Sequence, residues 1–118
     1  MDLSAEDELR ELQRDYLTDV REKLSLIREN ASSLARSRQF KTSFPVLLFL
    51  THQLKGSGGS LGFPRITDVA RKINLELNRY LEDDSYPRPT LAELSKSVEA
   101  LSEQLGEAVD ESERAVRA

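Results

Sequence analysis

The chain contains a single histidine, His52, and a lysine and several small residues follow it at helical spacing. Residues three and four positions apart lie on the same face of a helix, so Lys55 and Gly56 are expected one turn beyond His52. A neutral imidazole offers a nitrogen nucleophile. A phosphoryl group on that nitrogen would bring roughly two negative charges, which the ammonium of Lys55 could offset. The pattern predicts a histidine that carries a phosphoryl group and presents it to another protein.

Glycines gather directly after this histidine, at Gly56, Gly58 and Gly59. Each glycine destabilises a helix by roughly 1 kcal/mol relative to alanine. The packing of a plain helical bundle does not require three such residues beside its only histidine. By spacing, Gly56 and Gly59 are predicted to lie on the face of His52, where they leave room for the active-site loop of a partner. Gly58 is predicted to point inward, where it lets a neighbouring helix pack closely.

The stretch 52–63 resembles the signature of histidine phosphotransfer (HPt) domains, in which His-x-x-Lys-Gly is followed by small residues and then by Leu-Gly or Phe-Gly. Its tail, Gly-Gly-Ser-Leu-Gly-Phe, is also similar to the phosphoryl-carrying N-terminal domain of chemotaxis-type histidine kinases. The resemblance implies a helical bundle without a cofactor. It also implies that His52 exchanges a phosphoryl group with the aspartate of a response-regulator receiver domain, a sensor histidine kinase being the other expected partner.

The resemblance adds one position from a later helix. In related domains a Glu or Gln at the position of Asn74 hydrogen-bonds the ring nitrogen that is not phosphorylated. An amide can still accept the ring N–H of His52, although asparagine is one methylene shorter than glutamine. The alternative is that Asn74 is an ordinary polar residue at the surface.

The segment 44–50 is apolar on every side of the predicted helix, which is more than one core stripe requires. Leu48 and Phe49 precede His52 by four and three residues and therefore share its face. Exposed apolar side chains beside an active residue are typical of a partner surface, so Leu48, Phe49 and Gly59 are predicted to contact the partner. The alternative is that the bundle covers Phe49.

Composition bounds the remaining possibilities. The 118 residues fit one domain, predicted to span 1–118, and the net charge of −4 without a basic stripe argues against nucleic acid. The absence of cysteine rules out disulfides, and with one histidine it rules out a zinc site of His and Cys ligands. No apolar run is long enough to span a membrane, and the acidic N-terminus is not a signal peptide. A cytoplasmic protein with no metal of its own is expected.

Apolar residues recur with a helical period along most of the chain, and turn signals separate the segments. The segment 4–37 is predicted to form one long helix or a short one followed by a long one. The second helix is expected to begin near Pro45, with Ser43 as its cap, and to end at Gly62. A third begins at Pro64, and a fourth follows a capping box at Thr90.

The tail 110–118 is expected to fray. Four helices with one apolar stripe each favour an all-α fold, an antiparallel up-down four-helix bundle. A short extra helix at its N-terminus is the alternative form of this bundle.

Three functions remain open at this point. The first is a carrier that exchanges phosphoryl groups with receiver domains and is not itself an enzyme, because the chain lacks a glycine-rich nucleotide loop. The second is the N-terminal phosphoryl-carrying domain of a chemotaxis-type kinase. The third is an inert helical adaptor of the same shape, although such a form would be expected to lose His52 or Lys55.

Overall fold

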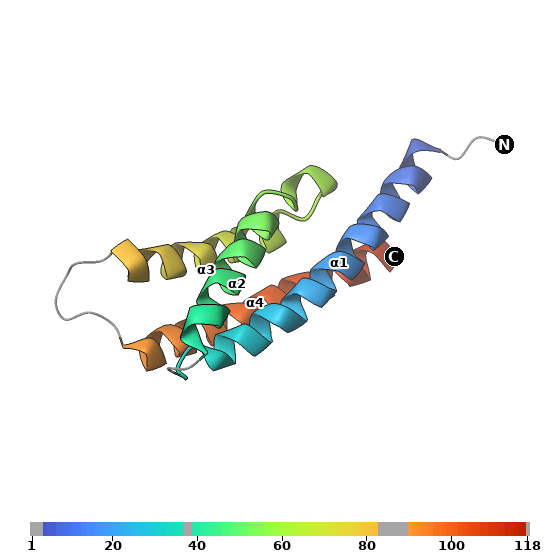
Figure 1. Ribbon diagram of the computed structural model, residues 1–118. Helices are drawn as coiled ribbons and strands as arrows, with labels where there is room; N and C mark the ends of the chain where they lie inside the picture. The colour runs from blue at the N-terminus through green and yellow to red at the C-terminus, as the bar shows by residue number, and fades with distance from the viewer. Residues whose placement is uncertain (1–3, 37–38, 83–89, 118) are drawn as a thin grey trace.

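The computed structural model describes residues 4–36, 39–82 and 90–117, and these ranges contain helices and turns but no strand. Four helices account for most of them: α1 (Ala5–Ser33), α2 (Phe40–Lys55), α3 (Pro64–Glu82) and α4 (Leu91–Arg117). A short 3₁₀ turn, η1 (Gly59–Leu61), lies between α2 and α3. Helix α1 packs against α2 and α4, and α3 packs against the same two helices, so the four form a bundle around one core (Figure 1).

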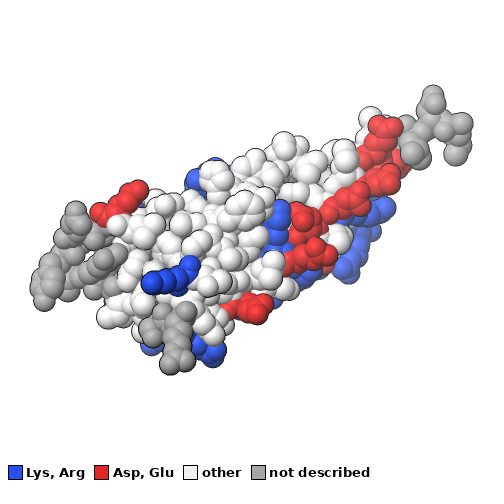
Figure 2. Space-filling model, viewed as in Figure 1, with Lys and Arg blue, Asp and Glu red and all other residues white. Residues whose placement is uncertain are grey.

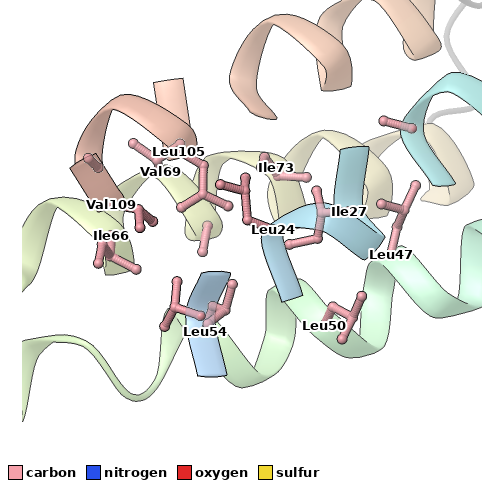
Figure 3. Close-up of a cluster of buried hydrophobic side chains, with 14 of the residues drawn as sticks. Leu24, Ile27, Leu47, Leu50, Leu54, Ile66, Val69, Ile73, Leu105 and Val109 are labelled. Carbon is pink, nitrogen blue, oxygen red and sulfur yellow. The ribbon is translucent and has the colours of Figure 1, made fainter. Parts of the chain in front are cut away.

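The core is built from the apolar stripes that the helical period predicts. Figure 3 shows aliphatic side chains from all four helices meeting between the ribbons. Members with no exposed surface include Leu24, Ile27, Leu47, Leu54, Ile66, Ile73, Leu105 and Val109. Full burial of such a side chain contributes roughly 1.5–3 kcal/mol. The packing of the α2 leucines in this core therefore fixes the orientation of α2 and with it the position of His52.

Helix α1 is one continuous helix, which decides between the two predicted possibilities. The side chain of Ser4 caps it by accepting a hydrogen bond from the backbone N–H of Asp7 at 3.1 Å. Leu9 and Leu12, however, are 44% and 57% exposed although they lie on the helical repeat of apolar residues along α1, which was expected to face the core. Helix α1 has 29 residues and α2 only 16, so their lengths are about 43 Å and about 24 Å. The first turns of α1 therefore extend past the end of α2 (Figure 1).

Helix α2 begins at Phe40, so the predicted start near Pro45 with a Ser43 cap is wrong. Ser43 is buried inside the helix, and Pro45 lies in its second turn. Aromatic packing explains the earlier start. The ring of Phe40 lies 5.1 Å from that of Phe44 and 6.2 Å from that of Tyr80, so the first turn of α2 is anchored on α3.

The other end of α2 also differs from the prediction. The helix ends at Lys55 rather than continuing to Gly62, because the glycines that follow favour a turn over a helix. Gly62 instead terminates η1 with a left-handed backbone, φ 90°, which glycine adopts without steric cost. His52 therefore lies in the last turn of α2 and not in its middle.

Helices α3 and α4 begin as predicted, at Pro64 and after a Thr90 cap whose hydroxyl accepts from the backbone N–H of Glu93. Helix α4 then continues to Arg117, so the frayed tail expected from residue 110 is helical through 117. The guanidinium of Arg21 on α1 explains this, since it lies 2.7 Å from Asp110 and 2.6 Å from Glu113. Within the described ranges, no helix is both long enough and apolar enough to cross a membrane.

Candidate functional site

His52 is exposed on the outer face of α2, in the last turn of the helix. The neighbours predicted for it by helical spacing differ in burial. Phe49, one turn before it, is 62% exposed, whereas Leu48 is half-buried and packs against the core. Lys55, one turn after it, is also half-buried. The side of this face toward α3 is thus supported by the bundle, and the other side is open.

The glycines after α2 divide into two kinds. A β-carbon added at Gly59 would meet no atom within 4 Å, and one at Gly56 would meet only the carbonyl of Gln53 at 3.9 Å. At Gly58 it would lie 2.6 Å from the hydroxyl of Thr67 and 2.8 Å from the carbonyl of Phe63. Gly58 is therefore needed for packing against α3, while the space at Gly56 and Gly59 is open to solvent.

Helix α1 braces the turn that holds these glycines. The phenol of Tyr16 and the hydroxyl of Ser57 are hydrogen-bonded at 2.9 Å, and the amide of Gln13 donates to the carbonyl of Leu61 at 2.8 Å. The ring of Tyr16 also stacks on that of Phe63. Burial raises the pKa of the Tyr16 phenol above its usual value of 10.0. The backbone beyond His52 is thus held from the side of α1 as well as α3.

Asn74 on α3 is buried, with 5% of its surface exposed, and its amide is fully hydrogen-bonded. Its nitrogen donates to the hydroxyl of Thr51 at 3.0 Å and to the carbonyl of Leu48 at 3.4 Å. Its oxygen accepts from the ammonium of Lys55 at 3.3 Å and from the amide of Asn78 at 3.0 Å. In the described part of the chain no hydrogen bond joins Asn74 to His52, so its role as a ring-orienting residue stays a prediction.

Sequence reasoning missed the two polar residues that complete this network, Thr51 and Asn78. Thr51 is fully buried next to His52 in the chain and donates its own proton to the carbonyl of Leu47 at 2.7 Å. Asn78 follows Asn74 by one helical turn. The signal that could have found them is the spacing of two asparagines on one face of α3, since a buried amide such as that of Asn74 requires polar partners nearby.

The sequence model of the Hpt domain family matches residues 11–115, which is most of the chain. The chain belongs to the Hpt domain family. Hpt domains are helical bundles that carry phosphoryl groups in phosphorelays. No curated protein and no solved structure matches the chain.

Charge is distributed in a way that suits an Hpt domain. All 21 acidic residues lie outside the segment 30–67, which contains α2 with His52 and the turn 56–62, called here the glycine turn. The same segment holds basic residues, Lys55 among them. Figure 2 shows that the face over α2 is largely uncharged, whereas acidic and basic side chains gather along α1. A phosphoryl group on His52 would therefore meet no like charge from its own helix.

Proposed function

We propose that this Hpt domain is a phosphoryl carrier in which His52 accepts a phosphoryl group from the aspartate of a response-regulator receiver domain and donates it to another. A sensor histidine kinase is the second class of partner. The observation that carries the proposal is the position of the only imidazole: it is exposed in the last turn of α2, one turn from Lys55, with open space at Gly56 and Gly59.

The chemical step needs little from this chain beyond a positioned nucleophile. A lone pair on the neutral imidazole of His52 forms the N–P bond while the P–O bond to the partner's aspartate breaks, and the aspartate leaves as a carboxylate. The reverse step transfers the group to the next receiver. Positioning and charge stabilisation dominate in phosphoryl transfer. In this proposal the magnesium ion belongs to the receiver, and the chain acts as a carrier and not as an enzyme.

Lys55 is proposed to offset part of the charge that the phosphoryl group brings. Its ammonium lies at the C-terminal end of α2, where the helix dipole favours a cation and disfavours an anion. A phosphoryl group on His52 would face the same dipole without compensation if Lys55 were absent. The positive charge of Lys55 thus offsets the repulsion between a phosphorylated His52 and the C-terminal end of the helix dipole.

The partner is proposed to dock on a face that consists of Leu48, Phe49, His52, Gly56 and Gly59, called here the docking face. Phe49 supports this most strongly, because a ring with 62% of its surface exposed gains by burial against a partner. Leu48 supports it less, since part of its side chain already packs against the core. Substitution of Leu48 is therefore expected to lower both partner binding and the stability of the bundle.

The arrangement of the bundle is proposed to be antiparallel and up-down. Short connections support it, because residues 34–39 and 56–63 leave little length for a chain to return along the bundle. Such an arrangement brings the C-terminal end of α2 beside the N-terminal part of α1, in agreement with the bond between Tyr16 and Ser57.

The experiment is a transfer assay with a phosphorylated receiver domain, magnesium and the purified chain. We expect a label on the chain that is labile in acid and stable in alkali, as is usual for a phosphoramidate. The chain incubated with ATP and magnesium alone should stay unlabelled. A label that appears from ATP without any kinase would refute the carrier assignment.

A further inference from the structure

The buried amide of Asn74 has a fixed orientation. Thr51 donates its only hydroxyl proton to the carbonyl of Leu47, so its oxygen can meet Asn74 only as an acceptor. The nitrogen end of the Asn74 amide must therefore face the hydroxyl of Thr51. Its oxygen end faces Lys55, and a flipped amide would set its N–H groups against the ammonium, donor against donor.

The same amide is fastened to the turn that carries His52. Its nitrogen lies 3.4 Å from the carbonyl of Leu48, which in an α-helix also accepts the backbone N–H of His52. Asn74 thus connects three points of α2: the turn before His52, the hydroxyl of Thr51 and the ammonium of Lys55. These are the contacts of a group that fixes where Lys55 stands relative to His52.

A neutral partner suits this task better than a carboxylate. A lysine side chain carries about 2 kcal/mol of rotamer entropy, so an unheld ammonium would spend much of its time away from His52. The Asn74 oxygen restrains it, and because the amide is uncharged, the positive charge stays available. Among the described residues Lys55 makes no salt bridge, so nothing there neutralises it.

We propose that Asn74 is a positioning residue for Lys55: its side-chain oxygen holds the ammonium where it meets the phosphoryl group on His52. This proposal rests on the proposed function of His52 and gives Asn74 a role that acts through Lys55 and not through the imidazole ring.

A double-mutant cycle on the rate of single-turnover phosphoryl transfer from a phosphorylated receiver tests this role. Asn74→Leu should slow transfer by about three- to tenfold in the wild-type background and by less than about twofold in a Lys55→Gln background. The matched control is Asn30→Ala, which removes an asparagine amide that donates to a carbonyl of its own helix α1, and it should slow transfer by less than about twofold. Equal slowing by Asn74→Leu in both backgrounds would overturn the proposal, because Asn74 would then act through the fold or the ring.

NMR of the unphosphorylated protein gives a second readout that does not depend on transfer. Protons of the Lys55 ammonium should exchange with water more slowly in the wild type than in Asn74→Leu, while the thermal unfolding curves establish that both are folded. Equal exchange rates in the two proteins would show that Asn74 does not hold the ammonium of Lys55, and the proposal would be overturned. A wild-type chain that accepts no phosphoryl group would instead refute the proposed function of His52, so the two failures are distinguishable.

Discussion

The side-chain oxygen of Asn74 on α3 lies 3.3 Å from the ammonium of Lys55 at the end of α2. This contact joins a buried amide to the cation that stands one helical turn beyond His52. The nitrogen of the same amide donates to the carbonyl of Leu48 and to the hydroxyl of Thr51, so Asn74 contacts α2 at three residues. If His52 carries a phosphoryl group, as proposed, this contact holds the ammonium of Lys55 near the charge that the group brings.

Gly58 and Gly59 form a matched pair for the two roles of the glycine turn. Gly58→Ala should lower the free energy of unfolding by about 1–2 kcal/mol, because the added methyl overlaps the hydroxyl of Thr67 and the carbonyl of Phe63. Gly59→Ala should leave it unchanged or raise it by up to about 1 kcal/mol, since that site is open. Chemical denaturation measures both. Equal losses for the two variants would contradict the assignment of Gly58 to packing.

Phe49 tests the docking face. Phe49→Ala should weaken binding of a receiver domain by about 1–2 kcal/mol and change thermal stability little, because most of the ring is already exposed. Isothermal titration and thermal unfolding give the two values. Leu75, 48% exposed on α3, is the control, and Leu75→Ala should leave binding unchanged. A large loss of stability in Phe49→Ala with unaltered binding would mean that the ring serves the bundle.

The hydrogen bond between Tyr16 and Ser57 tests the brace on the glycine turn. Tyr16→Phe keeps the stacking on Phe63 but removes the phenol oxygen, so the free energy of unfolding should fall by about 0.5–1.5 kcal/mol. Thr18→Val on the exposed side of the same helix is the control, because Thr18 bonds only to its own helix. If the two substitutions had the same effect, the brace would contribute nothing measurable.

The contact between Arg21 and Asp110 predicts a dependence of stability on acid. The hydrogen bond from Arg21 holds the pKa of the Asp110 carboxyl below its ordinary value of 3.8. A lowered pKa in the folded state stabilises the protein above pH 3.8, and this contribution is lost as the pH falls through the lowered value. Arg21→Gln should therefore lower Tm near neutral pH, and the difference from the wild type should shrink in stronger acid.

Arg71 provides the control for that measurement, because its pair with Asp68 is exposed and one turn apart on a single helix. Arg71→Gln should change Tm little at any pH. A gap between the wild type and Arg21→Gln that stays constant down to about pH 2 would mean that the carboxylate is not what Arg21 stabilises.

Much of the architecture could be predicted from the sequence, because it follows from local rules. The caps at Ser4 and Thr90 and the proline at the start of α3 act within one helical turn. Helix ends that depend on contacts between helices were predicted wrongly. The start of α2 is set by an aromatic contact with α3, and the end of α4 by Arg21 on α1.

In the site, too, the features that depend on one helix could be predicted and those that depend on contacts between helices could not. The face of His52, with Lys55 and the open Gly56, follows from spacing along one helix. The environment of Asn74 depends on how α3 docks against α2, and no pattern within α3 alone indicates that its oxygen faces Lys55. The exposure of Leu9 and Leu12 likewise depends on the lengths of helices far apart in the sequence.

The most direct test of the central claim is transfer out of the phosphorylated chain. The chain labelled from one receiver domain is purified and mixed with a second, unphosphorylated receiver and magnesium, and the label on both proteins is followed with time. We expect the label to leave His52 and appear on the aspartate of the receiver, and His52→Gln to take up no label at all. A label that persists on His52→Gln, or that never passes to a receiver, would contradict the account.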